Sequence, residues 1–317
     1  MLRNHDTESN LCSDVGYCSH AAESEPREIT VSAQLKPTSN TADADFCSVV
    51  ASILSSDQCE LPVLPEASAQ LLRMTSDVDC DVTDVIKVIR GDQSLTSHLL
   101  RIANSVRYNM GVTVTSIQQA VARLGLLTIR QIVVLISCQC RIFDVPGFEA
   151  DVRCSFQRSL AAAALAQEIA RVRRLNVEEA FLCGLLHDVG RPVLLQALMD
   201  RRRNAGLVFS DDELRNAAET HRIEFASRLI TCWELPSRLS QIIRHQSVPL
   251  EAESLTDNAA ILNLSIDLAE MLLSSDAELK AEQLVHPMIG VLNLYPEQLG
   301  TVLRKRDEIL EWVRSTV

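Results

Sequence analysis

Apolar side chains recur at intervals of three and four residues from Phe46 onward. Val49, Val50, Ile53 and Leu54 share one face of a helix, and the segment Leu61-Pro62-Val63-Leu64-Pro65 then interrupts the pattern. The same spacing predicts further helices over residues 67–74, 82–89, 94–105, 117–124, 126–142, 156–172 and 177–188. No run of strand length alternates with a period of two. The pattern therefore predicts an all-α fold.

Turn and capping residues divide the chain further. Ser210 and Glu213 have the spacing of a capping box, and Pro192, Pro236 and Pro296 stand where helices would begin. Residues 1–45 are polar and acidic without apolar periodicity, which predicts a disordered tail. A loop around Pro146 is the best internal boundary. We therefore expect an N-terminal helical subdomain over 46–143 and a second helical subdomain, with C-terminal helices, over 144–317.

Composition excludes some functions. The net charge of −12 repels a phosphate backbone, so no nucleic-acid partner is expected. The N-terminus lacks the apolar stretch of a signal peptide, and the longest apolar run is too short and too polar for a membrane span. The ten cysteines form no CxxC pair and no zinc spacing. We expect a cytoplasmic protein with mostly reduced, buried thiols and no membrane partner.

One polar pair ends an otherwise apolar helix. His187 and Asp188 follow Phe181-Leu182-Cys183-Gly184-Leu185-Leu186. Adjacent positions on a helix diverge by about 100°, so the pair could bind one metal only at a helix end where other ligands converge. Alternatively, Asp188 caps local amides while His187 fills a hydrogen-bonded core position. The dipeptide alone does not decide between these interpretations.

The surrounding residues resemble the HD superfamily of metal-dependent phosphohydrolases. That fold uses a histidine on an earlier helix, the His-Asp pair and a distant aspartate. The distant aspartate here would be Asp267, in Ile261-Leu262-Asn263-Leu264-Ser265-Ile266-Asp267. Arg158 stands at the expected place of the earlier histidine, and a protonated guanidinium cannot ligate a cation.

Several separated motifs over about residues 50–250 resemble the HDOD family, a degenerate relative of HD and HD-GYP hydrolases. They are Leu61–Pro65, Leu99-Leu100-Arg101-Ile102-Ala103-Asn104-Ser105 with Tyr108, Ser116-Ile117 to Leu124-Gly125, and Trp233-Glu234-Leu235-Pro236 followed by Ile243-Arg244-His245. The resemblance implies a multi-helix HDOD fold, with an N-terminal helical subdomain packed on an HD-like one. It also implies a regulatory role in bacterial signal transduction. For the polar patch around Asn104 we favour a helix C-cap and turn.

The sequence departs from the relatives' pattern at three places, and the first two weaken metal binding. Arg222 stands about eleven residues before the motif tryptophan, where a histidine is frequent, and His221 is one step out of register. His245-Gln246 replaces a double histidine. Asp92-Gln93 replaces Asp-Pro, which changes only a helix start.

The degenerate pocket would therefore contain His187, Asp188, Asp267, His245, Arg158 and Arg222. We expect no catalytic residue, no bound metal and no cofactor, with His187, Asp188 and Asp267 as the weak metal candidates. The two arginines could form ion pairs with Asp188 or Asp267, or bind an anion such as phosphate.

Three functions stay open. The first is a noncatalytic regulator that contacts other signalling proteins, including a second copy of itself in a homodimer. The second is a residual HD-type phosphohydrolase or cyclic-dinucleotide phosphodiesterase. The third is a small-anion or nucleotide sensor.

Overall fold

The computed structural model describes residues 42–55, 66–74, 80–105, 107–108, 111–139, 145–205, 209–233, 235–274 and 284–316. Its compact units are Met1–Cys59 and Glu60–Val317. The first contains α1 (Ala42–Ser55). The segment Leu61–Pro65 and residues 1–41 of the predicted tail lie outside the described residues. The last four residues of the predicted tail, 42–45, belong to α1. The boundary predicted between residues 143 and 144 stays a prediction.

The second unit begins with four helices, which are α2 (Glu66–Met74), α3 (Val82–Gly91), α4 (Gln93–Ala103) and α5 (Ile117–Gln139). Asp81 caps α3 by accepting from the Thr83 amide at 2.7 Å, and Asp92 caps α4 by accepting from the Leu95 amide at 2.9 Å. Asp92 thus starts α4 although Gln93, and not proline, follows it. Gly125 has non-helical dihedral angles inside α5, at the position where the sequence predicted one helix to end and the next to begin.

The loop after α4 is held by the polar patch that the sequence singled out. Asn104 is the C-cap of α4, and its amide group donates to the carbonyl oxygens of Leu100 (3.0 Å) and Val114 (2.8 Å). The Val114 amide donates back to Asn104 Oδ1 at 2.7 Å. The patch is therefore a helix cap that fixes a loop, as favoured above.

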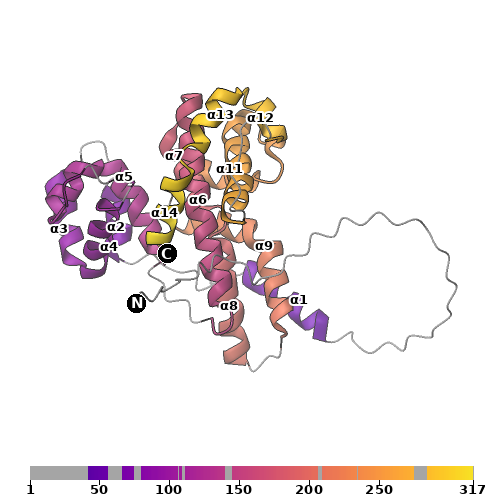
Figure 1. Ribbon diagram of the computed structural model, residues 1–317. Helices are drawn as coiled ribbons and strands as arrows, with labels where there is room; N and C mark the ends of the chain where they lie inside the picture. The colour runs from indigo at the N-terminus through magenta and orange to yellow at the C-terminus, as the bar shows by residue number, and fades with distance from the viewer. Residues whose placement is uncertain are drawn as a thin grey trace, which may run out of the picture. The chain divides into compact units, whose positions relative to one another are not determined.

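The rest of the unit is built around one long helix, α6 (Glu149–Arg173), which α7 (Val177–Leu186), α11 (Thr256–Ser274) and α14 (Arg306–Thr316) contact (Figure 1). The four consecutive alanines of α6, residues 161–164, have no exposed surface. A Cβ at Gly184 of α7 would lie 2.5 Å from Ala163 Cα. Small side chains therefore let the backbones of α6 and α7 approach closely.

Shorter helices complete the unit. They are α8 (Gly190–Ala205), α9 (Asp211–Cys232), α10 (Ser237–Arg244), α12 (Pro287–Val291) and α13 (Pro296–Leu303), with 3₁₀ turns at Pro249–Glu251 and Glu253–Leu255. The capping box predicted at the start of α9 is present, because the Glu213 amide donates to Ser210 Oγ and the Ser210 amide donates to the Glu213 carboxylate.

The described part of the chain contains helices and turns but no strand, which confirms the predicted all-α class. None of its helices combines the length and the apolar character needed to cross a lipid bilayer. Cys80, Cys183 and Cys232 carry thiol groups and are not disulfide-bonded. Cys154 is disulfide-bonded.

Candidate functional site

The His-Asp pair lies in the tight turn between α7 and α8. His187 is the C-cap of α7, and α8 begins at Gly190. A Cβ at Gly190 would lie 2.0 Å from the carbonyl oxygen of Arg222 in α9. Because a side chain does not fit there, the turn sits directly against the backbone of α9. His187 and Asp188 are both buried, with 3% and 1% of their surfaces exposed.

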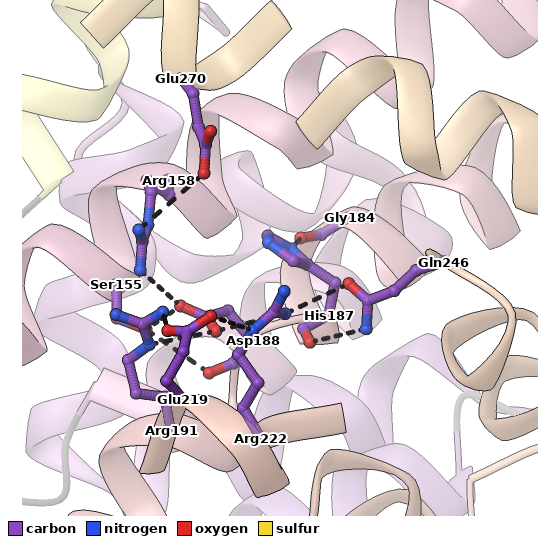
Figure 2. A network of polar contacts seen from close by, with 10 residues as sticks. All are labelled: Ser155, Arg158, Gly184, His187, Asp188, Arg191, Glu219, Arg222, Gln246 and Glu270. Carbon is purple, nitrogen blue, oxygen red and sulfur yellow. Dashed lines mark hydrogen bonds and ion pairs between the residues drawn. The ribbon is translucent and has the colours of Figure 1, made fainter. Parts of the chain in front are cut away.

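The Asp188 carboxylate is surrounded by a hydroxyl group and three guanidinium groups (Figure 2). Its Oδ2 atom accepts hydrogen bonds from Ser155 Oγ at 2.6 Å and from Arg158 Nη2 at 3.0 Å. Its Oδ1 atom lies 3.5 Å from Arg191 Nε and 3.7 Å from Arg222 Nη1. The arginines come from α6, α8 and α9, so one carboxylate joins three helices.

Further polar groups hold these arginines in place. The two oxygens of Glu219 bind Arg191 Nη2 and Arg222 Nε, the latter at 3.1 Å. Arg222 Nη1 donates to Gln246 Oε1 at 3.4 Å, and Gln246 Nε2 donates to the His187 carbonyl oxygen at 3.4 Å. Arg158 reaches Glu270 of α11 at 4.0 Å. We call Asp188, Arg158, Arg191, Arg222, Glu219 and Glu270 the arginine cluster.

The charges of the cluster determine the ionisation of Asp188. Burial alone would raise the pKa of this carboxyl group, but the positive charges of Arg191 and Arg158 and the neighbouring His187 and Arg222 outweigh burial and hold the pKa below its usual value. Asp188 is therefore a carboxylate at neutral pH.

His187 is a neutral imidazole. Burial lowers its pKa to about 4, and the nearby Arg222 and Arg158 act in the same direction, against the opposing influence of Asp188 and the hydrogen bond to Gly184. Its Nδ1 lies 2.7 Å from the Gly184 carbonyl oxygen, which can only accept, so Nδ1 carries the proton. The lone pair is left on Nε2.

Two of the six residues predicted for the pocket have other partners. Asp267 Oδ2 lies 2.8 Å from His286 Nε2, and its side chain is 44% exposed. His286 Nδ1 accepts from the Met288 amide, so Nε2 carries the proton that it donates to Asp267. His245 Nδ1 lies 2.8 Å from the carbonyl oxygen of Gln241. The structure thus brings together His187, Asp188, Arg158 and Arg222, and no described contact joins Asp267 or His245 to them.

The sequence analysis did not identify Arg191, Ser155, Glu219 and Glu270. Two of them had a readable signal, because Arg191 follows Asp188 by three residues and Glu219 precedes Arg222 by three, which are the spacings of neighbours on a helix. The sequence analysis had also noted Arg222 and Gln246, at positions where the resemblance implies histidines. His221 instead faces Glu224, at 3.9 Å.

A comparison with family models matches the HDOD domain over residues 61–249, which is more than half of the chain. The chain belongs to the HDOD family. Among curated proteins, an uncharacterized protein of Treponema pallidum is 23% identical over 252 residues, which are 75% of this chain and 47% of that protein. The chain thus spans about half the length of this curated relative.

Solved structures with the same fold include an HDOD domain protein of unknown function from Geobacter sulfurreducens, with a TM-score of 0.58 and 21% identity over 84% of this chain and 99% of that one. A protein from Shewanella amazonensis named "Putative phosphohydrolase" has a TM-score of 0.63 and 23% identity, over 85% and 98% of the two chains. A "Putative signal transduction protein" from Marinobacter aquaeolei has a TM-score of 0.56 and 21% identity, over 87% and 66%. These similarities establish the HDOD fold.

The arginine cluster does not fit the metal that the related HD hydrolases use. In the described part of the chain, no three His, Cys, Asp or Glu side chains converge as metal ligands. Asp188 is already paired with guanidinium groups, and Asp267 with His286. His187 Nε2 alone is a neutral donor of the right chemistry, and a single imidazole does not make a metal centre. The residues of the arginine cluster therefore do not fit a hydrolytic metal centre.

Proposed function

We propose that this HDOD protein is a noncatalytic regulatory module that acts through contacts with other signalling proteins in a bacterial cytoplasm. One observation carries the proposal. The buried Asp188 carboxylate, which would be a metal ligand in an HD hydrolase, is held by Ser155 and three arginines. A site whose acidic ligand is already neutralised can serve the fold but not two-metal hydrolysis. Family membership and the name of the Marinobacter relative support a role in signalling.

The alternative of a residual phosphohydrolase is supported by the intact His187-Asp188 pair, by Asp267 and by the name of the Shewanella relative. The geometry favours it less. Hydrolysis by two metals requires several carboxylate and imidazole ligands with an open position for water. Here Arg158 and Arg222 stand where the resemblance implies histidine ligands, and both contribute positive charge to the same pocket.

The alternative of an anion sensor depends on unbalanced positive charge. The three arginines of the cluster face three carboxylates, those of Asp188, Glu219 and Glu270. The positive and negative charges cancel, so no net charge is left over to attract phosphate. We therefore rank the anion sensor below the regulatory module.

Metal content and activity separate the regulator from the hydrolase. The purified protein is expected to contain no stoichiometric iron, manganese or zinc, and to leave cyclic dinucleotides and model phosphodiesters unhydrolysed when these metals are added. His187→Ala is the test variant, and His221→Ala, which changes a histidine outside the pocket, is the control. Stoichiometric metal together with turnover that His187→Ala abolishes and His221→Ala preserves would overturn the proposal.

The proposed contacts are tested by using the folded protein as bait in cytosol from its native cell. A signalling protein retained by the bait should then form a complex of defined stoichiometry when both components are purified and mixed. Light scattering on the bait alone detects the homodimer. If no partner and no dimer survive this reconstitution, regulation through protein contacts is refuted.

A further inference from the structure

The carboxylate of Asp188 is buried in a fold whose hydrolytic relatives bind a metal at this position. The Asp188 side chain is only 2% exposed, and an ionised carboxylate at that depth requires a compensating charge. We infer that the guanidinium groups of Arg158, Arg191 and Arg222 substitute for a metal ion as the counter-charge of Asp188. The HD-like half of this protein is then held together without metal.

The two oxygens of the carboxylate are bound from different sides. Ser155 and Arg158, both on α6, bind Oδ2 through direct hydrogen bonds. Arg191 on α8 and Arg222 on α9 flank Oδ1, which accepts no hydrogen bond within the described structure (Figure 2). Both arginines therefore act on Oδ1 mainly through charge. This is also how a cation would act on it.

Glu219 is the positioning residue of this arrangement. One of its oxygens binds Arg191 and the other binds Arg222, so the two guanidinium groups are held side by side over Oδ1. Gln246 holds the other end of Arg222 and also binds the His187 carbonyl oxygen. The arginines are thus anchored to the turn that carries Asp188, much as the protein ligands of a metal are fixed by surrounding hydrogen bonds.

The net charge of the cluster disfavours binding of a metal ion while the three arginines are present. The cluster is neutral as it stands, and a divalent cation would add two positive charges to a mostly buried site. Removing Arg191 and Arg222 should reverse this preference, because Asp188 Oδ1 would then lose both neighbouring positive charges while His187 Nε2 keeps its lone pair. Arg158 would stay on Oδ2. The inference concerns the stability of the fold and does not depend on the regulatory role.

The test compares thermal unfolding in EDTA and in millimolar Mn²⁺. Wild-type protein is expected to unfold at the same temperature in both buffers. Arg191→Met with Arg222→Met is expected to unfold on the order of 10 °C lower in EDTA, and to recover part of this loss in Mn²⁺. Adding Asp188→Asn should abolish the recovery. Arg202→Ala breaks an exposed ion pair with Asp211 and should behave like wild type.

If the double variant does not fold in EDTA, Arg222→Gln alone is the second variant, because it removes the more distant of the two arginines and leaves the rest of the cluster intact. The inference is overturned if Mn²⁺ stabilises wild type as much as the variants. It is equally overturned if the variants that fold lose no stability, or if Mn²⁺ restores none of the loss. None of these readouts measures turnover or partner binding, so the proposed function can fail or succeed independently.

Discussion

Replacing Gly190 with alanine should separate α8 from α9. The added Cβ would lie 2.0 Å from the Arg222 carbonyl oxygen and 2.6 Å from the Ala226 amide nitrogen. Both neighbours are backbone atoms, so no change of rotamer can relieve the overlap. The ordinary contact distance is about 3.5 Å, and the helices must therefore move apart by roughly 1 Å or more. Because Gly190 lies between Asp188 and Arg191, this movement should also pull on the arginine cluster.

Overpacking a close helix contact costs about 1–3 kcal/mol, and a backbone overlap of this depth belongs at the upper end. For a protein of this size, a loss of about 3 kcal/mol lowers the unfolding temperature by about 6–12 °C. The matched control is Gly290→Ala in α12, where an added Cβ meets nothing within 4 Å. Alanine is the better helix former by up to about 1 kcal/mol, so the control should be neutral or slightly stabilising.

Thermal and urea unfolding followed by circular dichroism measure both variants. If Gly190→Ala unfolds at the same temperature as Gly290→Ala, the close contact between α8 and α9 is refuted, because the added methyl group would then fit between the two helices.

Three further predictions concern stability at low pH, the contact between Arg107 and α14, and the loop after α4. The unfolded state takes up a proton on His187 between its normal pKa of about 6.5 and the folded value of about 4, so stability should fall by about 3 kcal/mol as pH drops through this window. His187→Gln should flatten this part of the pH profile in urea unfolding, and an unchanged slope would argue against a neutral buried imidazole. Arg107 bonds Gln167 and lies 5.1 Å from the Trp312 ring. Arg107→Lys should therefore cost about 1 kcal/mol and shift tryptophan emission to the red, and unchanged emission would contradict this contact. Asn104→Ala should speed hydrogen exchange at the Val114 amide, its bonding partner, and lower stability by about 1–3 kcal/mol; unchanged protection would exclude the clamp.

Local signals predicted the elements of this fold well. Apolar periodicity predicted the helices from α2 to α7, and Ser210 with Glu213 predicted the start of α9. The start of α6 was predicted at Phe156 but lies at Glu149. The missed segment contains Ser155, a buried polar residue that donates to the Asp188 carboxylate in the turn between α7 and α8. Periodicity cannot detect a polar side chain that faces a buried charge.

The candidate site was harder to predict because its contacts join distant segments. The resemblance to the HD and HDOD families pointed to His187, Asp188, Arg158 and Arg222. It could not show that Asp267 would bond to His286, which lies nineteen residues further on. The choice between two acceptable partners for a carboxylate depends on the path of the intervening backbone, and that path has no local signature.

The balanced charges of the arginine cluster also constrain how this protein can change over generations. A single substitution that restores one metal ligand, such as Arg222→His, removes a positive charge from Asp188 before a complete ligand set exists to bind a cation. Such a single variant would lose stability before it could bind a metal ion. Building a metal site by single substitutions would have to pass through several such weakened forms, so the balanced charges oppose a stepwise exchange of the arginines for metal ligands.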